Sequence, residues 1–312
     1  MNSSELTIKN QCLRLMVNPE RGMSVMAFFA RRGDEWLAIM PDTRGGASDL
    51  ASASFLLMPY SNRVEDGRFV FEGKKYQLAH AEKHAIHGDV RFRKWRTIEV
   101  TPDCIRCGFD SASFTDINWP WQFEAEVEYR LKGDIFSSRL LLRNRGDSAM
   151  PAGLGWHPYF NRKIIREGEP VILRLKVGAA YPDADNNRIP SGPPRPLTPE
   201  EDFSESRPLD PDYFLDTCFQ GYDGNGSIAW PESGIKVSFN CSPVCAHLIM
   251  YNPPGKPYFA IEPVTNANNG FNIYSRGEPG SGIVVLKPGE TLRAEFNLRV
   301  ETNQVIQGGV AL

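Results

Sequence analysis

The chain has 312 residues, of which 41% are hydrophobic and 23% are charged, and its formal net charge is −3. This balance is typical of a globular protein and excludes the strongly basic character of nucleic-acid-binding domains. No apolar run approaches the roughly 18 residues that a membrane-spanning helix needs, and the N-terminal residues lack the pattern of a secretory signal. We therefore expect a cytoplasmic protein with reduced cysteines and without nucleic-acid or membrane partners.

Hydrophobic and polar residues alternate with a period of two along much of the chain. Residues 67–78 are predicted to form a hairpin with Glu72 and Gly73 at its turn. In 122–131 and in 291–300 every second side chain is apolar, which is typical of half-buried antiparallel strands. Further strands are predicted at 11–17, 25–29, 34–39, 96–101, 135–143, 171–177, 235–239, 246–251, 258–262 and 282–286.

The overall pattern indicates an all-β protein. No long segment has a helical period, and 27 glycines and 24 prolines separate the short predicted strands. Many strands joined by turns predict a large sandwich or barrel, and the absence of a clear linker predicts one domain over 1–312. The irregular stretch 181–213 is long enough to be functional, although it could equally be a surface excursion.

Glu262 is the most informative polar residue because it follows four apolar residues in YFAIEP (258–263). A carboxylate in apolar surroundings is costly unless it is paired or functional. Burial would raise its pKa and make it a better base near neutral pH. The alternative is a glutamate at the end of a strand that reaches solvent.

His157 lies in the apolar stretch GLGWHPYF (153–160) and, like Glu262, precedes a proline. A residue before proline is restricted to extended conformations, so both side chains would be held on constrained backbones. Such preorganisation suits catalytic groups. The alternative for His157 is a core histidine whose nitrogens are satisfied by hydrogen bonds.

Three other polar residues are candidates, and each has a structural alternative. Arg63 could be a surface arginine paired with Glu65 or Asp66. His87 precedes a glycine and could be an ordinary loop histidine, and Asp216 could be a turn or cap carboxylate. The nearby charges of 91–94 could hold a phosphate, or they could form a solvated strand face.

Motifs for other chemistries are absent from the sequence. It contains no GxSxG, phosphate-binding GxxxxGK[ST], HExxH or dinucleotide-binding glycine motif, so we expect neither a cofactor nor a metal. The single CxxC at 104–107 lies in a predicted strand and has no second pair. The remaining Glu, His, Arg and Asp side chains suit proton transfer to a polyhydroxylated ligand.

Several motifs together resemble the aldose 1-epimerase (galactose mutarotase) family over nearly the whole chain. They occur in the family's order, and each is weaker alone than the set: NPERGMSVMAFFARRGDEWLAIMP (18–41), PYSNRVEDGRFVFEGKKYQL (59–78), IHGDVRFRKW (86–95), GLGWHPYF (153–160), LDTCFQG (215–221) and AIEPVTNANNGFN (260–272).

The resemblance implies a large antiparallel β-sandwich of the galactose mutarotase-like (supersandwich) type. It implies an isomerase that interconverts the α and β anomers of a free aldose without a cofactor, as a monomer or homodimer. Glu262 would be the general base and His157, in its protonated form, the general acid. The base would take the anomeric hydroxyl proton while the acid protonates the ring oxygen; the ring then opens, rotates and closes.

The resemblance also implies that Arg63, His87 and Asp216 bind the sugar. An aromatic residue could stack on the sugar ring, with Trp121, Trp156 and Tyr159 as candidates.

Two departures from the family pattern leave the substrate open. Asp89 follows His87-Gly88, and the glutamate segment continues as NANNGFN. One alternative is an epimerase of a phosphorylated or acidic sugar, which the charges of 91–94 would favour. Another is a non-catalytic carbohydrate-binding protein on the same fold. A polysaccharide-cleaving enzyme on a related sandwich would need a longer chain.

Overall fold

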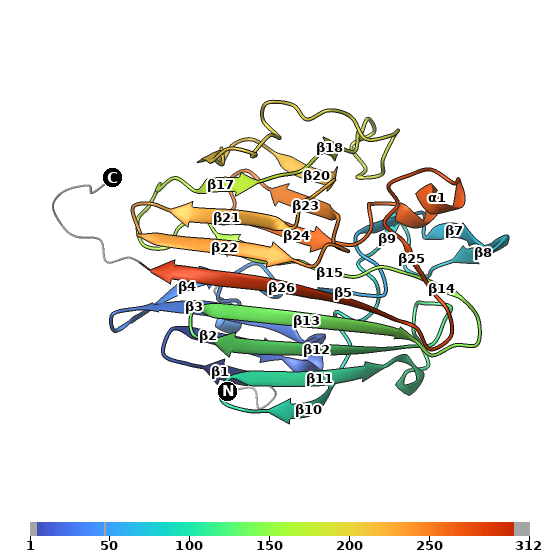
Figure 1. Ribbon diagram of the computed structural model, residues 1–312, viewed down its shortest axis with the longest axis horizontal. Coiled ribbons are helices and arrows are strands. Elements are labelled where there is room, and N and C mark those ends of the chain that lie inside the picture. The colour runs from blue at the N-terminus through green and yellow to red at the C-terminus, as the bar shows by residue number, and fades with distance from the viewer. Residues whose placement is uncertain (1–4, 47, 303–312) are drawn as a thin grey trace.

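The computed structural model describes residues 5–46 and 48–302, and their regular secondary structure consists almost entirely of antiparallel strands. The largest sheet has nine strands. In spatial order they are β10 (Arg96–Val100), β11 (Cys104–Asp110), β12 (Phe123–Lys132), β13 (Ile135–Asn144), β26 (Thr291–Thr302), β22 (Ile235–Cys241), β21 (Asn225–Trp230), β17 (Ile172–Leu175) and β19 (Arg207–Pro208). The central strands run side by side across Figure 1.

The alternation predicted for two of these strands is confirmed. In β12 the side chains from Phe123 to Leu131 at odd positions are buried, and in β26 the same holds from Leu292 to Val300 at even positions. Their apolar faces therefore point into the core, whereas the charged positions between them face outward.

A second, seven-stranded sheet carries most of the candidate residues. Its strands are β18 (Ala179–Ala180), β20 (Leu215–Gln220), β23 (His247–Asn252), β24 (Tyr258–Val264), β15 (Gly155–Trp156) and β5 (Leu56–Leu57), and β16 (Tyr159–Asn161) also pairs with β24. β24 is buried along its whole length. Phe259 and Ile261 point into the main core, so Ala260 and Glu262 face the opposite side of the sheet.

The remaining strands form smaller sheets. They are β1 (Leu6–Lys9), β2 (Leu13–Asn18), β3 (Ser24–Arg32) and β4 (Glu35–Met40) in one sheet, and the pairs β6 (Arg63–Glu65) with β9 (His84–Ile86), β7 (Arg68–Phe71) with β8 (Lys74–Gln77), and β14 (Met150–Ala152) with β25 (Val284–Leu286). The predicted hairpin at 67–78 is confirmed as β7–β8, with Glu72 and Gly73 both at positive φ in the turn.

The main departure from the strand prediction is one short α-helix, α1 (Gly270–Ser275). It lies beside the β7–β8 hairpin at the right-hand end of Figure 1, where Phe271 stacks on Phe69 with ring centroids 4.8 Å apart. The irregular stretch predicted at 181–213 is interrupted by β19.

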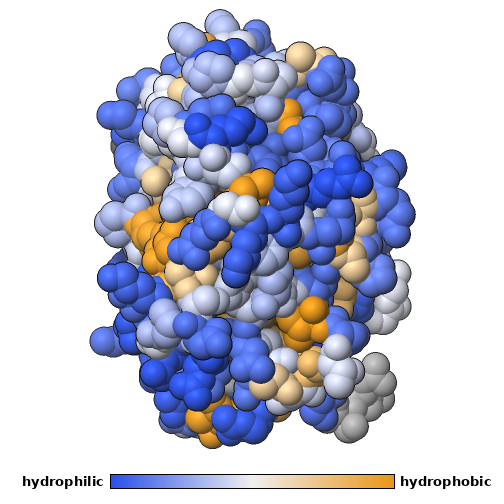
Figure 2. All heavy atoms as spheres, turned by 90° about the vertical axis from the view of Figure 1, so that its right-hand side faces the viewer, coloured by the Kyte–Doolittle hydropathy of each residue, from blue (hydrophilic) through white to orange (hydrophobic). Residues whose placement is uncertain are grey.

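One large buried cluster, from Ile8 to Val300, joins the apolar faces of the two large sheets and the N-terminal sheet. The structure is therefore a β-sandwich, as predicted. The end of the molecule shown in Figure 2 is mostly hydrophilic, with small and separate hydrophobic patches. Within residues 5–46 and 48–302 no helix has the length and apolar character needed to cross a membrane.

Candidate functional site

His157 and Glu262 meet because two short strands pair with the same long strand. β15 pairs with β24 at Gly155–Val264, and β16 pairs with it again at Tyr159–Ala260. His157 lies in the interruption between β15 and β16, opposite Glu262. Its Nε2 is 3.1 Å from Oε1 of Glu262. The two prolines that follow these residues lack an N–H, so they fit this gap in the hydrogen-bond ladder.

The approach of β15 to β24 requires a glycine. A Cβ on Gly155 would lie 2.6 Å from Cγ1 of Val264 and 2.7 Å from the carbonyl oxygen of Pro263. A side chain at this position would collide with β24. Gly155 therefore helps to fix the distance between the His157 and Glu262 side chains.

Asp216 lies on the same sheet face as Glu262, two strands away. Across the ladder, Asp216 pairs with Tyr251, which in turn pairs with Ala260, two residues before Glu262. The side chains of directly paired strand residues point to one face. Asp216 is on a strand, so the expected alternative of a turn or cap carboxylate is wrong.

Arg63 and His87 come from the paired segments β6 and β9. The backbone N–H of His87 donates to the carbonyl oxygen of Asn62 at 2.9 Å, and Nη1 of Arg63 donates to Oδ1 of Asn62 at 3.1 Å. Among the described residues Arg63 makes no ion pair, so its predicted alternative pairing with Glu65 or Asp66 is wrong. The rings of His87 and His157 lie edge to face with centroids 5.4 Å apart.

His87 has a left-handed backbone with φ of 65°, which is uncommon for residues other than glycine, although histidine adopts it more often than most. The ring is nevertheless buried, with 7% of the residue exposed. Such strained conformations persist where the surrounding structure over-determines them, and they concentrate at functional sites. His87 is thus more constrained than an ordinary loop histidine.

Burial changes the proton affinity of the central pair. Glu262 is 2% exposed, so the alternative of a carboxylate that reaches solvent is wrong. Burial raises the pKa of Glu262 well above its ordinary value; the charge of Asp216 adds to this rise, and that of Arg63 opposes it. Burial, together with the charges of Arg91 and Arg63, also lowers the pKa of His157 to about 3.

These shifts favour a neutral imidazole and a protonated carboxyl group. The carboxyl proton is then the one titratable proton of the pair, and it can be shared across the 3.1 Å contact between Nε2 and Oε1. Burial likewise lowers the pKa of His87 well below its ordinary value. The resemblance implied that His157 acts in its protonated form, so a proton must reach its imidazole before it acts as the acid.

Four buried polar atoms at the site lack a hydrogen-bond partner among the described residues: Nδ1 of His87, Nδ1 of His157, Oε2 of Glu262 and Oδ1 of Asn268. Buried polar atoms are nearly always satisfied in proteins, so a concentration of such atoms requires an explanation. The alternative of a core histidine with satisfied nitrogens does not describe His157. A polar ligand with several hydroxyl groups would supply the missing partners.

Aromatic side chains form one wall of the site. The ring of Phe55 stacks on the ring of His157 with centroids 4.4 Å apart. The ring of Tyr159 lies on the His157 ring at a tilt, with centroids 4.6 Å apart. Of the three aromatic residues suggested for sugar stacking, only Tyr159 lies at the site. Trp156 packs on Phe296 in the core, and Trp121 belongs to the aromatic cluster around β7 and β8.

The cationic residues at 91–94 do not form one patch. Arg93 is paired with Asp89 at 2.8 Å and Asp116 at 2.6 Å, and Lys94 is paired with Glu20 at 2.8 Å. Arg91 is different, because its guanidinium makes no ion pair within 5–46 and 48–302. It lies 4.6 Å from the ring of Phe92 and 5.6 Å from that of Phe55, on the side of the site.

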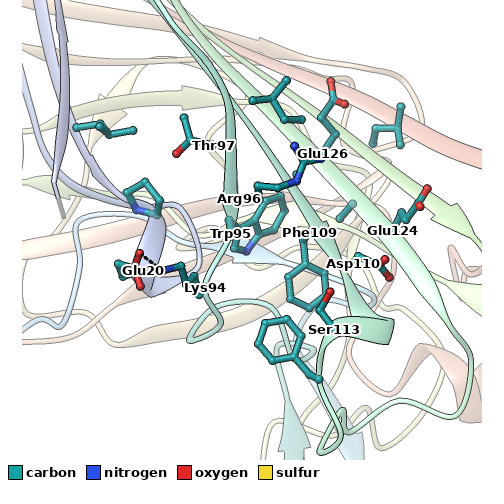
Figure 3. Close-up of a pocket in the computed structure, with 17 residues that line it drawn as sticks. Glu20, Lys94, Trp95, Arg96, Thr97, Phe109, Asp110, Ser113, Glu124 and Glu126 are labelled. Carbon is teal, nitrogen blue, oxygen red and sulfur yellow. Dashed lines mark ion pairs between the residues drawn. The ribbon is translucent and has the colours of Figure 1, made fainter.

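The structure has a small cavity at the site and a larger hollow away from it. A cavity of about 180 Å³ adjoins Asp216 and is lined by Tyr181, Asp183, Arg188, Cys218 and Asn268 among others. A larger hollow, of about 950 Å³, lies elsewhere, between the N-terminal segment and strands β10 to β13. Figure 3 shows it lined by charged side chains, with Lys94 and Glu20 pointing toward each other.

Sequence reasoning missed three residues of the site: Phe55, Arg188 and Asn268. For Asn268 a signal was present, because it lies in the NANNGFN segment noted as unusual. Arg91 was considered only as part of a charged run. Within the part of the chain that the structure describes, no group of three or more His, Cys, Asp or Glu side chains is arranged to hold a metal ion.

The chain was compared with known proteins. Residues 5–299 match the profile of the family described as Aldose 1-epimerase. Uncharacterized protein YphB of Escherichia coli K12 is 27% identical over 309 residues, which is 95% of this chain and 98% of that protein. Galactose mutarotase of Rattus norvegicus is 28% identical over 141 residues, or 42% of this chain and 39% of that protein.

Solved structures show the same fold. A galactose mutarotase-like protein from Clostridium acetobutylicum superimposes with a TM-score of 0.82 at 20% identity, covering 96% of this chain and 95% of that one. At this identity the likeness establishes the fold alone.

Proposed function

Because the chain belongs to the aldose 1-epimerase family, we propose that it interconverts the α and β anomers of an aldose by acid–base opening and closure of the ring. The observation that carries this proposal is the buried pair of His157 and Glu262, 3.1 Å apart, with an unpartnered oxygen on Glu262 among the described residues. A base and an acid side by side are what hemiacetal opening requires.

In this proposal the anomeric hydroxyl of the sugar donates a hydrogen bond to Oε2 of Glu262. Such a bond stabilises the carboxylate form, and the charge of Arg63 does the same. The proton of the pair then moves to His157, which becomes the acid. The resting neutral imidazole is therefore compatible with the acid role, because the sugar itself shifts the proton across the pair.

The reaction then proceeds with Glu262 taking the proton of the anomeric hydroxyl while His157 protonates the ring oxygen as the C1–O5 bond breaks. Rotation about C1–C2 of the open aldehyde exposes its other face, and closure returns both protons. Arg63 and His87, which lie close to the pair, would bind sugar oxygens on which charge develops. Tyr159 and Phe55, which pack against the ring of His157, would add apolar contacts beside the sugar.

The test is proton NMR of freshly dissolved α-glucose and α-galactose, with and without the protein, in weak buffer. We expect the β-anomer signal to appear faster with the protein. If no free, phosphorylated or acidic aldose is accelerated, the epimerase proposal fails. Sugar binding without acceleration would instead favour a carbohydrate-binding protein.

A second candidate is an epimerase of an aldose that carries an anionic group, either a phosphate or a carboxylate. Arg91 favours it, since this half-buried guanidinium has no carboxylate partner among the residues that the structure describes and lies beside His157. Burial lowers the pKa of Arg91, which indicates that its charge is incompletely solvated. An anionic substituent would compensate this charge.

Exchange NMR distinguishes the candidates by comparing glucose, glucose 6-phosphate and glucuronate as substrates. A charged substrate for this site would exchange at least about tenfold faster than glucose, and Arg91→Met would remove that preference. Arg96→Met is the matched control, because Arg96 is exposed on the large hollow. Equal or faster exchange of glucose would rule out the charged substrates.

A further inference from the structure

The irregular segment after β18 supplies one side chain to the candidate site. Nε of Arg188 donates to Oδ2 of Asp216 at 2.7 Å, and Nη1 of Arg188 donates to Oδ2 of Asp183 at 2.6 Å. The Arg188 side chain is 18% exposed, and those of Asp183 and Asp216 are 22% and 15% exposed. Arg188 thus bridges a carboxylate of its own segment and the carboxylate on β20.

The position of Arg188 is fixed by more than these two ion pairs. Its carbonyl oxygen accepts a hydrogen bond from Nδ2 of Asn268 at 2.9 Å, and its guanidinium lies 5.1 Å from the ring of Phe214. Its backbone is left-handed, with φ of 68°, a conformation that favours glycine. An arginine held in a strained conformation by several contacts indicates a function for its guanidinium.

Two acceptor atoms lie beside this bridge. Oδ1 of Asn268 is buried and has no partner in the described ranges, and it belongs to a residue that is 3% exposed. Arg188 binds Oδ2 of Asp216 and so leaves Oδ1 of that carboxylate for a ligand. Asn268 and Asp216 both line the cavity of about 180 Å³. Their oxygens are suited to accept hydrogen bonds from hydroxyl groups.

We propose that Arg188 is a positioning residue for the sugar, which holds Asp216 and the Asn268 segment so that both accept hydroxyl groups other than the anomeric one. This inference rests on the proposed function, and it assigns a role to the 181–192 part of the irregular segment. Because Arg188 acts on binding and does not touch the reacting atoms, its loss raises KM more than it lowers kcat.

Arg188 also has an electrostatic effect on the pair. The charged groups that face Glu262 are His157, Arg63 and Asp216, with Tyr159 and Cys218 as titratable neighbours. Asp216 raises the pKa of Glu262, and Arg188 partly compensates the charge of Asp216. Without Arg188 the alkaline limb of the activity profile therefore moves to higher pH.

The decisive variant is Arg188→Gly, because glycine suits the left-handed backbone and retains the carbonyl that Asn268 binds. We expect a normal melting temperature, a KM raised about tenfold or more, and a kcat within about threefold of the wild type. Added methylguanidinium should restore part of the affinity. Arg188→Lys keeps the charge but cannot bond Asp183 and Asp216 with two arms. Its KM should therefore lie between those of the wild type and Arg188→Gly.

Arg207→Met is the matched control, since Arg207 lies in the same region, is bonded to the backbone oxygens of Pro199 and Asp202, and does not contact Asp216. It should leave KM and kcat unchanged. The proposal is overturned if Arg188→Gly leaves KM unchanged, or if Arg207→Met raises KM equally.

The failure of this inference can be told apart from failure of the proposed function. If the wild type accelerates no aldose, calorimetry of sugar binding still compares Glu262→Gln with the double variant that also carries Arg188→Gly. Weaker binding in the double variant supports the positioning role, and equal affinity, or no binding by either protein, overturns it.

Discussion

The two hollows of the molecule differ in size and in the state of their polar groups. The groove beside strands β10 to β13 has a volume of about 950 Å³, against about 180 Å³ for the cavity beside Asp216. In the groove, exposed charges form an ion pair between Lys94 and Glu20. At the candidate site, buried polar atoms lack partners among the described residues.

This difference shows that volume alone does not identify a site of chemistry. Exposed ion pairs are largely solvated and shift the proton affinities of their members little. Buried groups without partners store the unfavourable desolvation that a ligand can relieve. The following experiments test whether function follows the buried groups, as we expect, or the larger hollow.

The largest expected effect separates two glutamates that undergo the same substitution. Glu262→Gln removes the proposed base and should lower the epimerase rate by about 10² to 10⁴-fold. Glu126→Gln makes the same chemical change in the groove and should retain the full rate. Both are measured by NMR of anomer exchange, with circular dichroism as a check of folding. A Glu262→Gln variant with most of its rate would remove Glu262 from the base role.

The pH profile of kcat/KM tests the single proton of the pair. Activity should be lost only when the pair gains a second proton or loses its one. Since burial lowers the pKa of His157 to about 3, the acid limb should lie well below the ordinary histidine value of 6.5. Since burial raises the pKa of Glu262, the alkaline limb lies well above 4.5. An acid limb centred near 6.5 would contradict this account.

Replacing Glu262 should raise the stability of the protein at pH 7, although it lowers the activity. A raised folded-state pKa means that stability is fully present below 4.5 and is lost as pH rises through the folded-state pKa. Glu262→Gln should therefore melt at a higher temperature than the wild type at pH 7, by about 1.5 °C for each kcal/mol gained. Calorimetric melting at pH 4 should show no such gain, and a gain of equal size at both pH values would point to packing.

The smallest effect is expected from the groove. Lys94→Ala removes an exposed ion pair with Glu20, which contributes at most about 1 kcal/mol. Turnover should change less than about twofold, since Lys94 has no contact with the buried pair. The same exchange measurement checks this result. A large loss of activity would bring the groove into the function and erase the distinction between the two hollows.

Local patterns in the sequence predicted much of the fold. Alternation in 122–131 and 291–300 and the turn residues of 67–78 each depend on neighbours in the chain, and the structure confirms all three. The helix α1 was missed because six residues are too few for a helical period to appear. Its position depends on packing against Phe69, a residue distant in sequence.

The candidate site was predictable where a residue contradicts its surroundings. Glu262 and His157 are polar residues in apolar segments, and the structure places both in a buried pair. Arg91 and Arg188 give no such signal, because arginines in polar segments are ordinary. What distinguishes them is the ion pair that Arg91 lacks among the described residues and the bridge that Arg188 makes. Both depend on strand register and on a crossing segment, which one sequence does not reveal.

The narrow contact at Gly155 has a consequence for how this protein can diverge. A single methyl group there would press on Val264 and Pro263 and drive β15 away from β24. The His157–Glu262 contact would open, although both residues and every other sugar-binding candidate would still be present. A descendant of this chain could thus become inactive through one alanine while its catalytic motif stayed intact. Among relatives, the residue at this position is as informative about retained activity as the acid and the base themselves.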